Sequence, residues 1–110
     1  MIVDDNEKMR RMIREALSGY ADNFIECSNG ADAINAYPDF QPDGVAMDVM
    51  MEPMDGISAT RAITANFPDA NIVIVTQYDE QRLRDAAKRA GAKGFILKEN
   101  LDELPEIFAK

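Results

Sequence analysis

The chain has 110 residues, 46% of them hydrophobic and 29% charged, and its net charge is −8 at pH 7. These values predict a single globular domain over residues 1–110, with no output domain, whose core is large enough to fold without disulfides. The acidic balance argues against direct nucleic-acid binding, which needs Lys and Arg, and the lack of histidine excludes histidine-based catalysis and zinc chemistry.

The first half of the chain alternates short apolar segments with segments of helical periodicity. We expect a strand at 1–3, and then a helix over 6–18 that Asn6 caps. A second strand is expected at 24–27. The helix after it follows an Asn-Gly turn and is expected to stop at Pro38, because the residue before a proline disfavours helical backbone.

The second half continues the same alternation. Further strands are expected at 45–48, 72–75 and 94–97. Helices are expected after each strand, ending near residue 68, at Gly91 and, for the segment 101–109, at residue 109. The strand at 72–75 is apolar on both faces, which is typical of a strand covered by helices on both sides. Five such alternations predict a parallel sheet built from βα units.

Five polar or charged side chains directly follow four of these apolar segments: Asp4, Asp5, Asp48, Thr76 and Lys98. The carboxyl ends of parallel strands meet at one edge of the sheet, where open α/β sheets bind ligands. Three carboxylates at that edge would repel each other without a cation, and their oxygens suit Mg²⁺. A hydroxyl and an ammonium beside them suit phosphoryl oxygens. The pattern therefore predicts phosphorylation of an aspartate.

Each of these residues also has a simpler interpretation when it is taken alone. Asp4 and Asp5 fit the start of a loop and a helix cap, Thr76 fits the end of a strand, and Lys98 fits a solvated charge. Asp55 is expected to cap a helix rather than to bind a ligand. Only the co-occurrence of the five residues favours the functional interpretation.

Taken together, these motifs resemble the receiver domain of bacterial two-component response regulators over essentially the whole chain. The matching segments are Val3-Asp4-Asp5, Asp48 followed by Met51, Pro53, Met54, Asp55 and Gly56, then Val75-Thr76, and Phe95-Ile96-Leu97-Lys98. The resemblance implies an α/β fold of the flavodoxin-like, three-layer (βα)5 type. Its five-stranded parallel sheet would have the order 2-1-3-4-5, with helices on both faces.

The resemblance also implies a role for each residue. Asp48 would accept a phosphoryl group from a sensor histidine kinase or a histidine phosphotransfer protein, which fits a chain without histidine. Mg²⁺ would be held by Asp4, Asp5, Asp48 and the backbone carbonyl of Met50. Thr76 and Lys98 would contact the phosphoryl oxygens. The chain would be no enzyme beyond its own phosphorylation and dephosphorylation.

Signalling is implied to pass through Thr76 and Phe95. If Thr76 moves toward the phosphoryl group, Phe95 can rotate and reshape the surface of the fourth helix, fifth strand and fifth helix. A half-buried strand aromatic is the simpler interpretation of Phe95. A homodimer through the same surface is a further expectation.

Five positions depart from the family pattern or bear on how long the phosphoryl group lasts. Glu52 stands where a proline is usual, Gln77 where a small residue is usual, and Glu99 where a proline is common. The cis peptide of the family is therefore not expected after Lys98. Met50 and Tyr78 would flank the phosphoryl group, and neither is a carboxylate or an amide that could orient an attacking water. We therefore expect slow hydrolysis.

Three alternatives remain at this point. The chain could be the same receiver cut from a DNA-binding transcriptional regulator, a pseudo-receiver that only scaffolds partners, or a Mg²⁺-dependent phosphatase with an aspartyl-phosphate intermediate. The single Cys27 and the lack of a long apolar segment predict a cytoplasmic protein without a membrane span.

Overall fold

A computed structural model of the chain describes residues 1–109, and its centre is one five-stranded parallel sheet. The strands are β1 (Ile2–Val3), β2 (Glu26–Cys27), β3 (Val45–Met47), β4 (Ile72–Thr76) and β5 (Gly94–Leu97). They are arranged in the order β2-β1-β3-β4-β5, which confirms the predicted flavodoxin-like topology. Strand β1, the first along the chain, therefore lies between β2 and β3.

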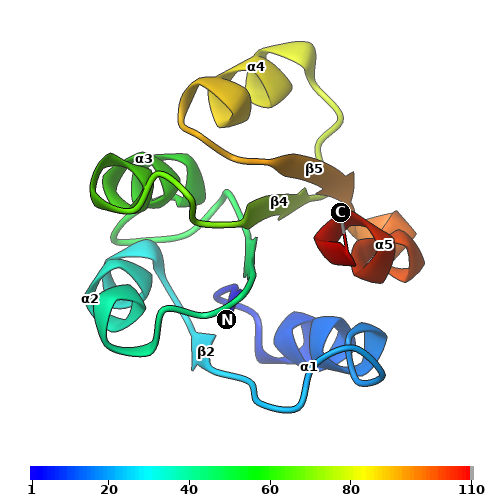
Figure 1. Cartoon of the computed structure of the whole chain (residues 1–110). Coiled ribbons are helices and arrows are strands. Elements are labelled where there is room, and N and C mark those ends of the chain that lie inside the picture. Colours follow the sequence, from blue (N-terminus) through cyan, green and yellow to red (C-terminus); the bar gives the residue numbers. More distant parts are fainter. Residues whose placement is uncertain (110) are drawn as a thin grey trace.

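Helices cover both faces of this sheet (Figure 1). The helices are α1 (Glu7–Ala16), α2 (Gly30–Phe40), α3 (Gly56–Asn66), α4 (Gln81–Arg89) and α5 (Leu104–Ala109), and the 3-10 helix η1 (Lys98–Glu103) precedes α5. Helices α2, α3 and α4 pack on one face, and α1, η1 and α5 pack on the other. All five residues of β4 are buried, which explains its uninterrupted apolar sequence.

Two predicted helix boundaries were wrong. Helix α2 does not stop at Pro38 but continues to Phe40. Proline removes only its own backbone donor, and the helix still closes beyond it, because Gln41, in the left-handed region at φ 38°, donates its N–H to the Tyr37 carbonyl. The helix predicted over 101–109 is α-helical only from Leu104, because residues 101–103 belong to the 3-10 helix η1.

Helix caps place the segments that lead to the carboxyl edge of the sheet. The side chains of Asn6 and Asp55 accept hydrogen bonds from the backbone N–H groups of Met9 and Ser58, as the sequence predicted. Gly91 follows α4 with φ 102°, a conformation that favours glycine and that confirms its place at the helix exit.

Candidate functional site

Three carboxylates converge at the carboxyl edge of the sheet. Because Val3 of β1 pairs with Met47 of β3, the residues that follow these two strands lie side by side. Asp4, Asp5 and Asp48 each offer a carboxylate oxygen, and these oxygens lie within 4.8 Å of one another. Asp4 is fully buried and Asp48 is 5% exposed, whereas Asp5 is exposed to solvent. The predicted cluster therefore forms, with one side open to water.

Asp4 has one carboxylate oxygen that the protein leaves without a hydrogen bond. Its Oδ1 accepts the backbone N–H of Asn6 at 2.9 Å. Its Oδ2 is buried and has no hydrogen-bond partner within residues 1–109, although the Lys98 ammonium lies 3.1 Å away. A buried carboxylate oxygen that shares its one ammonium partner with Asp48 is costly. This oxygen, beside two further carboxylates, fits a hard divalent cation such as Mg²⁺.

Lys98 is the cation that the fold itself supplies to the cluster. It follows β5, and its ammonium lies 3.1 Å from Asp4 Oδ2 and 3.2 Å from Asp48 Oδ1. One ammonium beside three carboxylates leaves an excess of negative charge. A further cation would therefore reduce the excess negative charge of the site.

The pKa values of Asp48 and Lys98 are both raised, which disfavours the charge of Asp48 and favours that of Lys98. Burial, and then the neighbouring carboxylate of Asp4, raise the pKa of Asp48 from 3.8 to about 6, against the opposing effect of Lys98. Burial alone would lower the pKa of Lys98, but the carboxylates of Asp48 and Asp4 outweigh it and raise that pKa above its ordinary value. Lys98 therefore stays charged at neutral pH, and Asp48 is the group whose charged form is disfavoured.

The Asp48→Asn variant is expected to be more stable than the wild type in metal-free solution. The pKa of Asp48 is higher in the folded state, so the protonated carboxyl stabilises the fold below pH 3.8, and this contribution is lost as the pH rises through about 6. A shift of about two units corresponds to about 3 kcal/mol, and solvent screening at this open edge reduces the measured part to about 1–2 kcal/mol.

Urea unfolding in EDTA measures this difference. The variant should have the higher free energy of unfolding at about pH 7.5. The difference should nearly vanish at about pH 3.5, where the Asp48 carboxyl is protonated in both the folded and the unfolded wild type. Saturating Mg²⁺ should stabilise the wild type more than the variant and so reduce the difference between their free energies of unfolding. An Asp48→Asn variant that is less stable than the wild type in EDTA at about pH 7.5 would contradict this account of the site.

Thr76 ends β4 at the same edge and is buried. Its hydroxyl oxygen accepts the backbone N–H of Tyr78 at 3.2 Å, and within residues 1–109 it has no hydrogen bond to Asp48. The strand register pairs Thr76 with Leu97 and Ile74 with Phe95, so Thr76 and Phe95 lie on the same face of the sheet. The two residues predicted to form the switch are therefore diagonal neighbours.

Phe95 is half-buried and lies beneath a side chain of α4 that the sequence analysis missed. The Arg84 guanidinium lies 4.5 Å from the centre of the Phe95 ring, and it pairs with Asp79 at 2.9 Å. A cation over an aromatic face stabilises this arrangement. The outward side of Phe95 is therefore tied, through Arg84, to the segment between β4 and α4.

The backbone around Met50 leaves its carbonyl oxygen available. In the segment between β3 and α3, the Val49 carbonyl accepts the N–H of Gly56, and the Met54 carbonyl accepts the N–H of Gly30. Within residues 1–109 the Met50 carbonyl accepts no backbone hydrogen bond. The Met50 side chain is 63% exposed. The predicted carbonyl ligand is thus free of competing contacts.

The three departures from the family pattern lie at the surface. Glu52, Gln77 and Glu99 are all exposed. The bond before Glu99 is trans, as predicted, and the cis peptide bond within residues 1–109 is Glu52–Pro53.

Comparisons with known proteins agree with this geometry. The family model for the response regulator receiver domain matches residues 1–109. The chemotaxis protein CheY of Halobacterium salinarum is 37% identical over 98 residues, which cover 89% of this chain and 82% of that protein. The transcriptional regulatory protein YhcZ of Bacillus subtilis is 35% identical, over all of this chain but 51% of its own length.

Solved structures show the same likeness. A two-component response regulator of the LuxR family from Aurantimonas sp. SI85-9A1 superimposes with a TM-score of 0.91 at 29% identity. The match covers 99% of this chain and 83% of that chain.

Proposed function

This chain belongs to the response regulator receiver domain family, and we propose that it accepts a phosphoryl group on Asp48 in a Mg²⁺-dependent reaction. The observation that carries the proposal is the convergence of three carboxylates and the Lys98 ammonium at one edge of the sheet. Asp48 lies 3.2 Å from the Lys98 ammonium, and burial disfavours its charged form.

The chain offers a consistent set of ligands for Mg²⁺. The carboxylates of Asp4, Asp5 and Asp48 and the carbonyl of Met50 would hold it. When bound, the ion supplies positive charge that neutralises the carboxylates and the phosphoryl oxygens. The Oδ2 of Asp4 supports this assignment, because it is a buried carboxylate oxygen whose partner, the Lys98 ammonium, is shared with Asp48.

The residues of the chain divide the phosphoryl transfer between them. A carboxylate oxygen of Asp48 attacks the phosphorus of a phosphohistidine, the O–P bond forms, and the P–N bond breaks to release the imidazole of the donor. Lys98 pairs with a phosphoryl oxygen while it remains near Asp4. The Thr76 hydroxyl turns from the Tyr78 N–H toward a second oxygen. Catalysis is positioning and charge neutralisation.

The same movement would transmit the signal. When the Thr76 hydroxyl leaves its bond to the Tyr78 N–H, the segment between β4 and α4 changes. Arg84, which is ion-paired with Asp79 of that segment, then changes its cation–π contact with Phe95. We infer that the surface of α4, β5 and α5 is the output surface of the domain.

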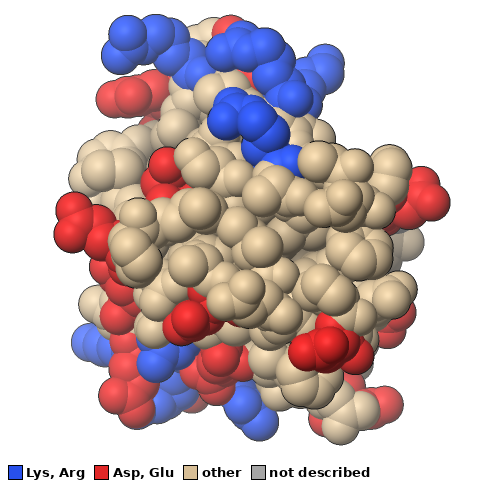
Figure 2. Space-filling model, turned by 90° about the vertical axis from the view of Figure 1, so that its left-hand side faces the viewer, with Lys and Arg blue, Asp and Glu red and all other residues tan. Residues whose placement is uncertain are grey.

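Charge and shape support a docking role for that surface. Lys and Arg gather over α4 at the top of the molecule in Figure 2, while the face of α2 and α3 below it carries few charges. A groove of about 240 Å³ lies between α4 and β5, lined by Arg84, Lys88, Lys93 and Phe95, among other residues. A second copy of the chain, as a homodimer, is the partner that we propose for it.

Receiver domains interact in general with histidine kinases or phosphotransfer proteins. We propose that such a kinase or phosphotransfer protein, acting in the cytoplasm, is the donor for this chain. The chain would catalyse no reaction other than its own phosphorylation and dephosphorylation. None of the helices within residues 1–109 is both long and apolar enough to cross a membrane.

Intact mass after incubation with acetyl phosphate tests the proposal. We expect one phosphoryl adduct per chain with Mg²⁺ and none in EDTA. An adduct that forms equally well in EDTA, or labelling at several sites, would contradict it.

Loss of the phosphoryl group in buffer is expected to be slow. Met50 and Tyr78 are both exposed, and neither is a carboxylate or an amide that could orient an attacking water. Substitution by Met50→Asn or Tyr78→Glu should therefore speed the loss, because each introduces such a group. The adduct is followed by intact mass after removal of acetyl phosphate. Rapid loss from the wild type that neither substitution changes would rule out this explanation.

A further inference from the structure

The backbone of Asp4 is held from two sides at the point where β1 ends. Its N–H still donates to the Cys27 carbonyl of the neighbouring strand, at 3.1 Å. Its own carbonyl lies beyond the last residues that pair in the sheet and accepts a side chain instead. Nη1 of Arg10, from α1, donates to that carbonyl at 2.7 Å. A helix side chain thus supplies the hydrogen bond that the sheet no longer provides.

Arg10 is itself fixed by a carboxylate of β2. Its Nε donates to Oε1 of Glu26 at 3.0 Å, and its side chain is 17% exposed. The other oxygen of Glu26 accepts Nη1 of Arg14, also at 3.0 Å. Two arginines one helical turn apart therefore share one carboxylate, and one of them also contacts the metal-binding segment.

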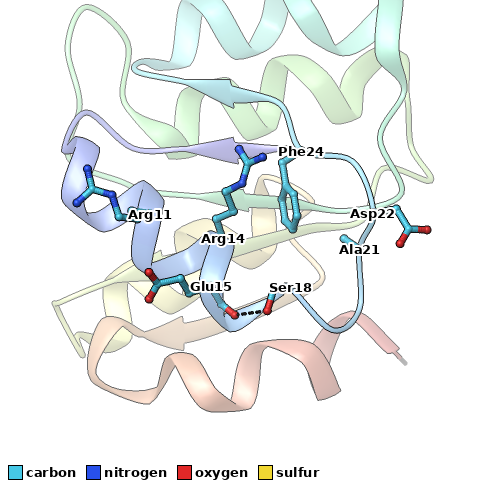
Figure 3. Close-up of a pocket in the computed structure, with 7 residues that line it drawn as sticks. All are labelled: Arg11, Arg14, Glu15, Ser18, Ala21, Asp22 and Phe24. Atoms are coloured by element: carbon cyan, nitrogen blue, oxygen red, sulfur yellow. Dashed lines mark hydrogen bonds between the residues drawn. The ribbon is translucent and has the colours of Figure 1, made fainter.

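Arg14 differs from Arg10 in what else it touches. Its guanidinium lies 4.9 Å from the centre of the Phe24 ring, and Figure 3 shows the two side chains together at the rim of a shallow depression beside α1. Arg14 makes no hydrogen bond to Asp4 within residues 1–109. The pair is therefore a matched comparison: both arginines bind Glu26, and only Arg10 reaches Asp4.

We infer that Arg10 is a positioning residue for the acidic cluster, which holds the segment carrying Asp4 and Asp5 in the geometry that binds Mg²⁺. The inference rests on the proposed function and names a contributor that no carboxylate pattern reveals. Asp5 is exposed, so the placement of its carboxylate depends on the backbone that precedes it. The bond from Arg10 to the Asp4 carbonyl fixes that backbone one residue earlier.

Charge and positioning predict opposite effects for Arg10. A guanidinium near the cluster repels a divalent cation, so charge alone predicts tighter Mg²⁺ binding when Arg10 becomes neutral. Positioning predicts weaker binding, because the segment that carries two ligands is released. The sign of the change in affinity therefore separates the two effects.

The experiment compares Arg10→Lys, Arg10→Gln and the control Arg14→Gln in a Mg²⁺ titration followed by amide chemical shifts. We expect the Mg²⁺ dissociation constant to rise about tenfold in both Arg10 variants, and to change by less than about twofold in Arg14→Gln. Arg10→Lys keeps the charge but lacks the fork that reaches Glu26 and Asp4 together.

Labelling by acetyl phosphate supplies an independent measurement. The Mg²⁺ concentration for half-maximal labelling should rise about tenfold in the Arg10 variants, while the rate at saturating Mg²⁺ returns to within about twofold of the wild type. A general loss of structure would instead lower the maximal rate. Urea unfolding of each variant checks the fold.

Glu26→Gln keeps both arginines and weakens only their shared anchor, so it remains informative if an Arg10 variant unfolds. We expect it to raise the dissociation constant about threefold. Equal or tighter Mg²⁺ binding in Arg10→Gln and Glu26→Gln would overturn the inference while leaving the proposed function in place. A wild type that binds no Mg²⁺ and forms no adduct would overturn both.

Discussion

Replacing Asp48 by asparagine is expected to abolish the phosphoryl adduct that acetyl phosphate forms with the wild type in the presence of Mg²⁺. Asparagine has nearly the same shape, but its amide lacks the nucleophilic carboxylate oxygen and the charge that a divalent cation needs. The Lys98 ammonium lies 3.2 Å from Asp48 Oδ1, where it can pair with an oxygen of the transferred group. Intact mass should show no adduct for the variant.

Asp55→Asn is the matched control for this change. Asp55 follows β3 in the same segment, but its side chain caps α3 through Ser58, and asparagine can serve as the same cap. This variant should be labelled like the wild type. An adduct that persists in Asp48→Asn would place phosphorylation elsewhere. If the wild type forms no adduct, the Gln77→Ala variant is tested next. Labelling of this variant would show that the Gln77 side chain obstructs the site, and no labelling would indicate a pseudo-receiver.

Replacing Gly56 by alanine is expected to destabilise the domain by about 3 kcal/mol or more. Gly56 is buried at the start of α3, directly against the backbone of Asp48. A Cβ at this position would lie 1.7 Å from the Asp48 carbonyl oxygen. The obstacle is backbone rather than a flexible side chain, so α3 must move away from β3. That movement would also break the bond from the Gly56 N–H to the Val49 carbonyl.

Urea unfolding of Gly56→Ala beside Gly19→Ala measures this effect. A Cβ on Gly19 would meet no atom within 4 Å, and alanine there should leave the stability unchanged or raise it by less than about 1 kcal/mol. Gly56→Ala should also lose labelling, because Asp48 itself must shift. A Gly56→Ala variant within about 1 kcal/mol of the wild type would show that the β3–α3 contact yields more easily than its geometry indicates.

The fold was predicted well because its signals are local. Each strand is a short apolar segment bounded by polar or turn-forming residues, and β4 is apolar on both faces because both faces are covered. The caps at Asn6 and Asp55 follow from the same local chemistry. The strand order came from the family resemblance, since local patterns do not say which strands pair.

The predictions that failed concern the ends of helices, where the geometry of one turn decided the outcome. Pro38 was expected to end α2, but the bond from Gln41 to Tyr37 closes the helix beyond it. The final segment becomes α-helical only at Leu104, although the apolar spacing indicated one helix over 101–109. Both are choices within a single turn, where the differences in energy are small.

The sequence by itself determined the candidate phosphorylation site, because parallel strands bring the residues after their carboxyl ends to one edge whatever the details of packing. Their positions along the chain place Asp4, Asp5, Asp48 and Lys98 at that edge, and the strand order implied by the family resemblance makes them neighbours. The residues that position these side chains could not be predicted in this way. Helical spacing indicates that Arg10 and Arg84 face outward, and it says nothing of the strand or aromatic ring beside them. Only the tertiary structure brings Arg10 to the Asp4 carbonyl and Arg84 over Phe95, because these contacts depend on how each helix lies across the sheet.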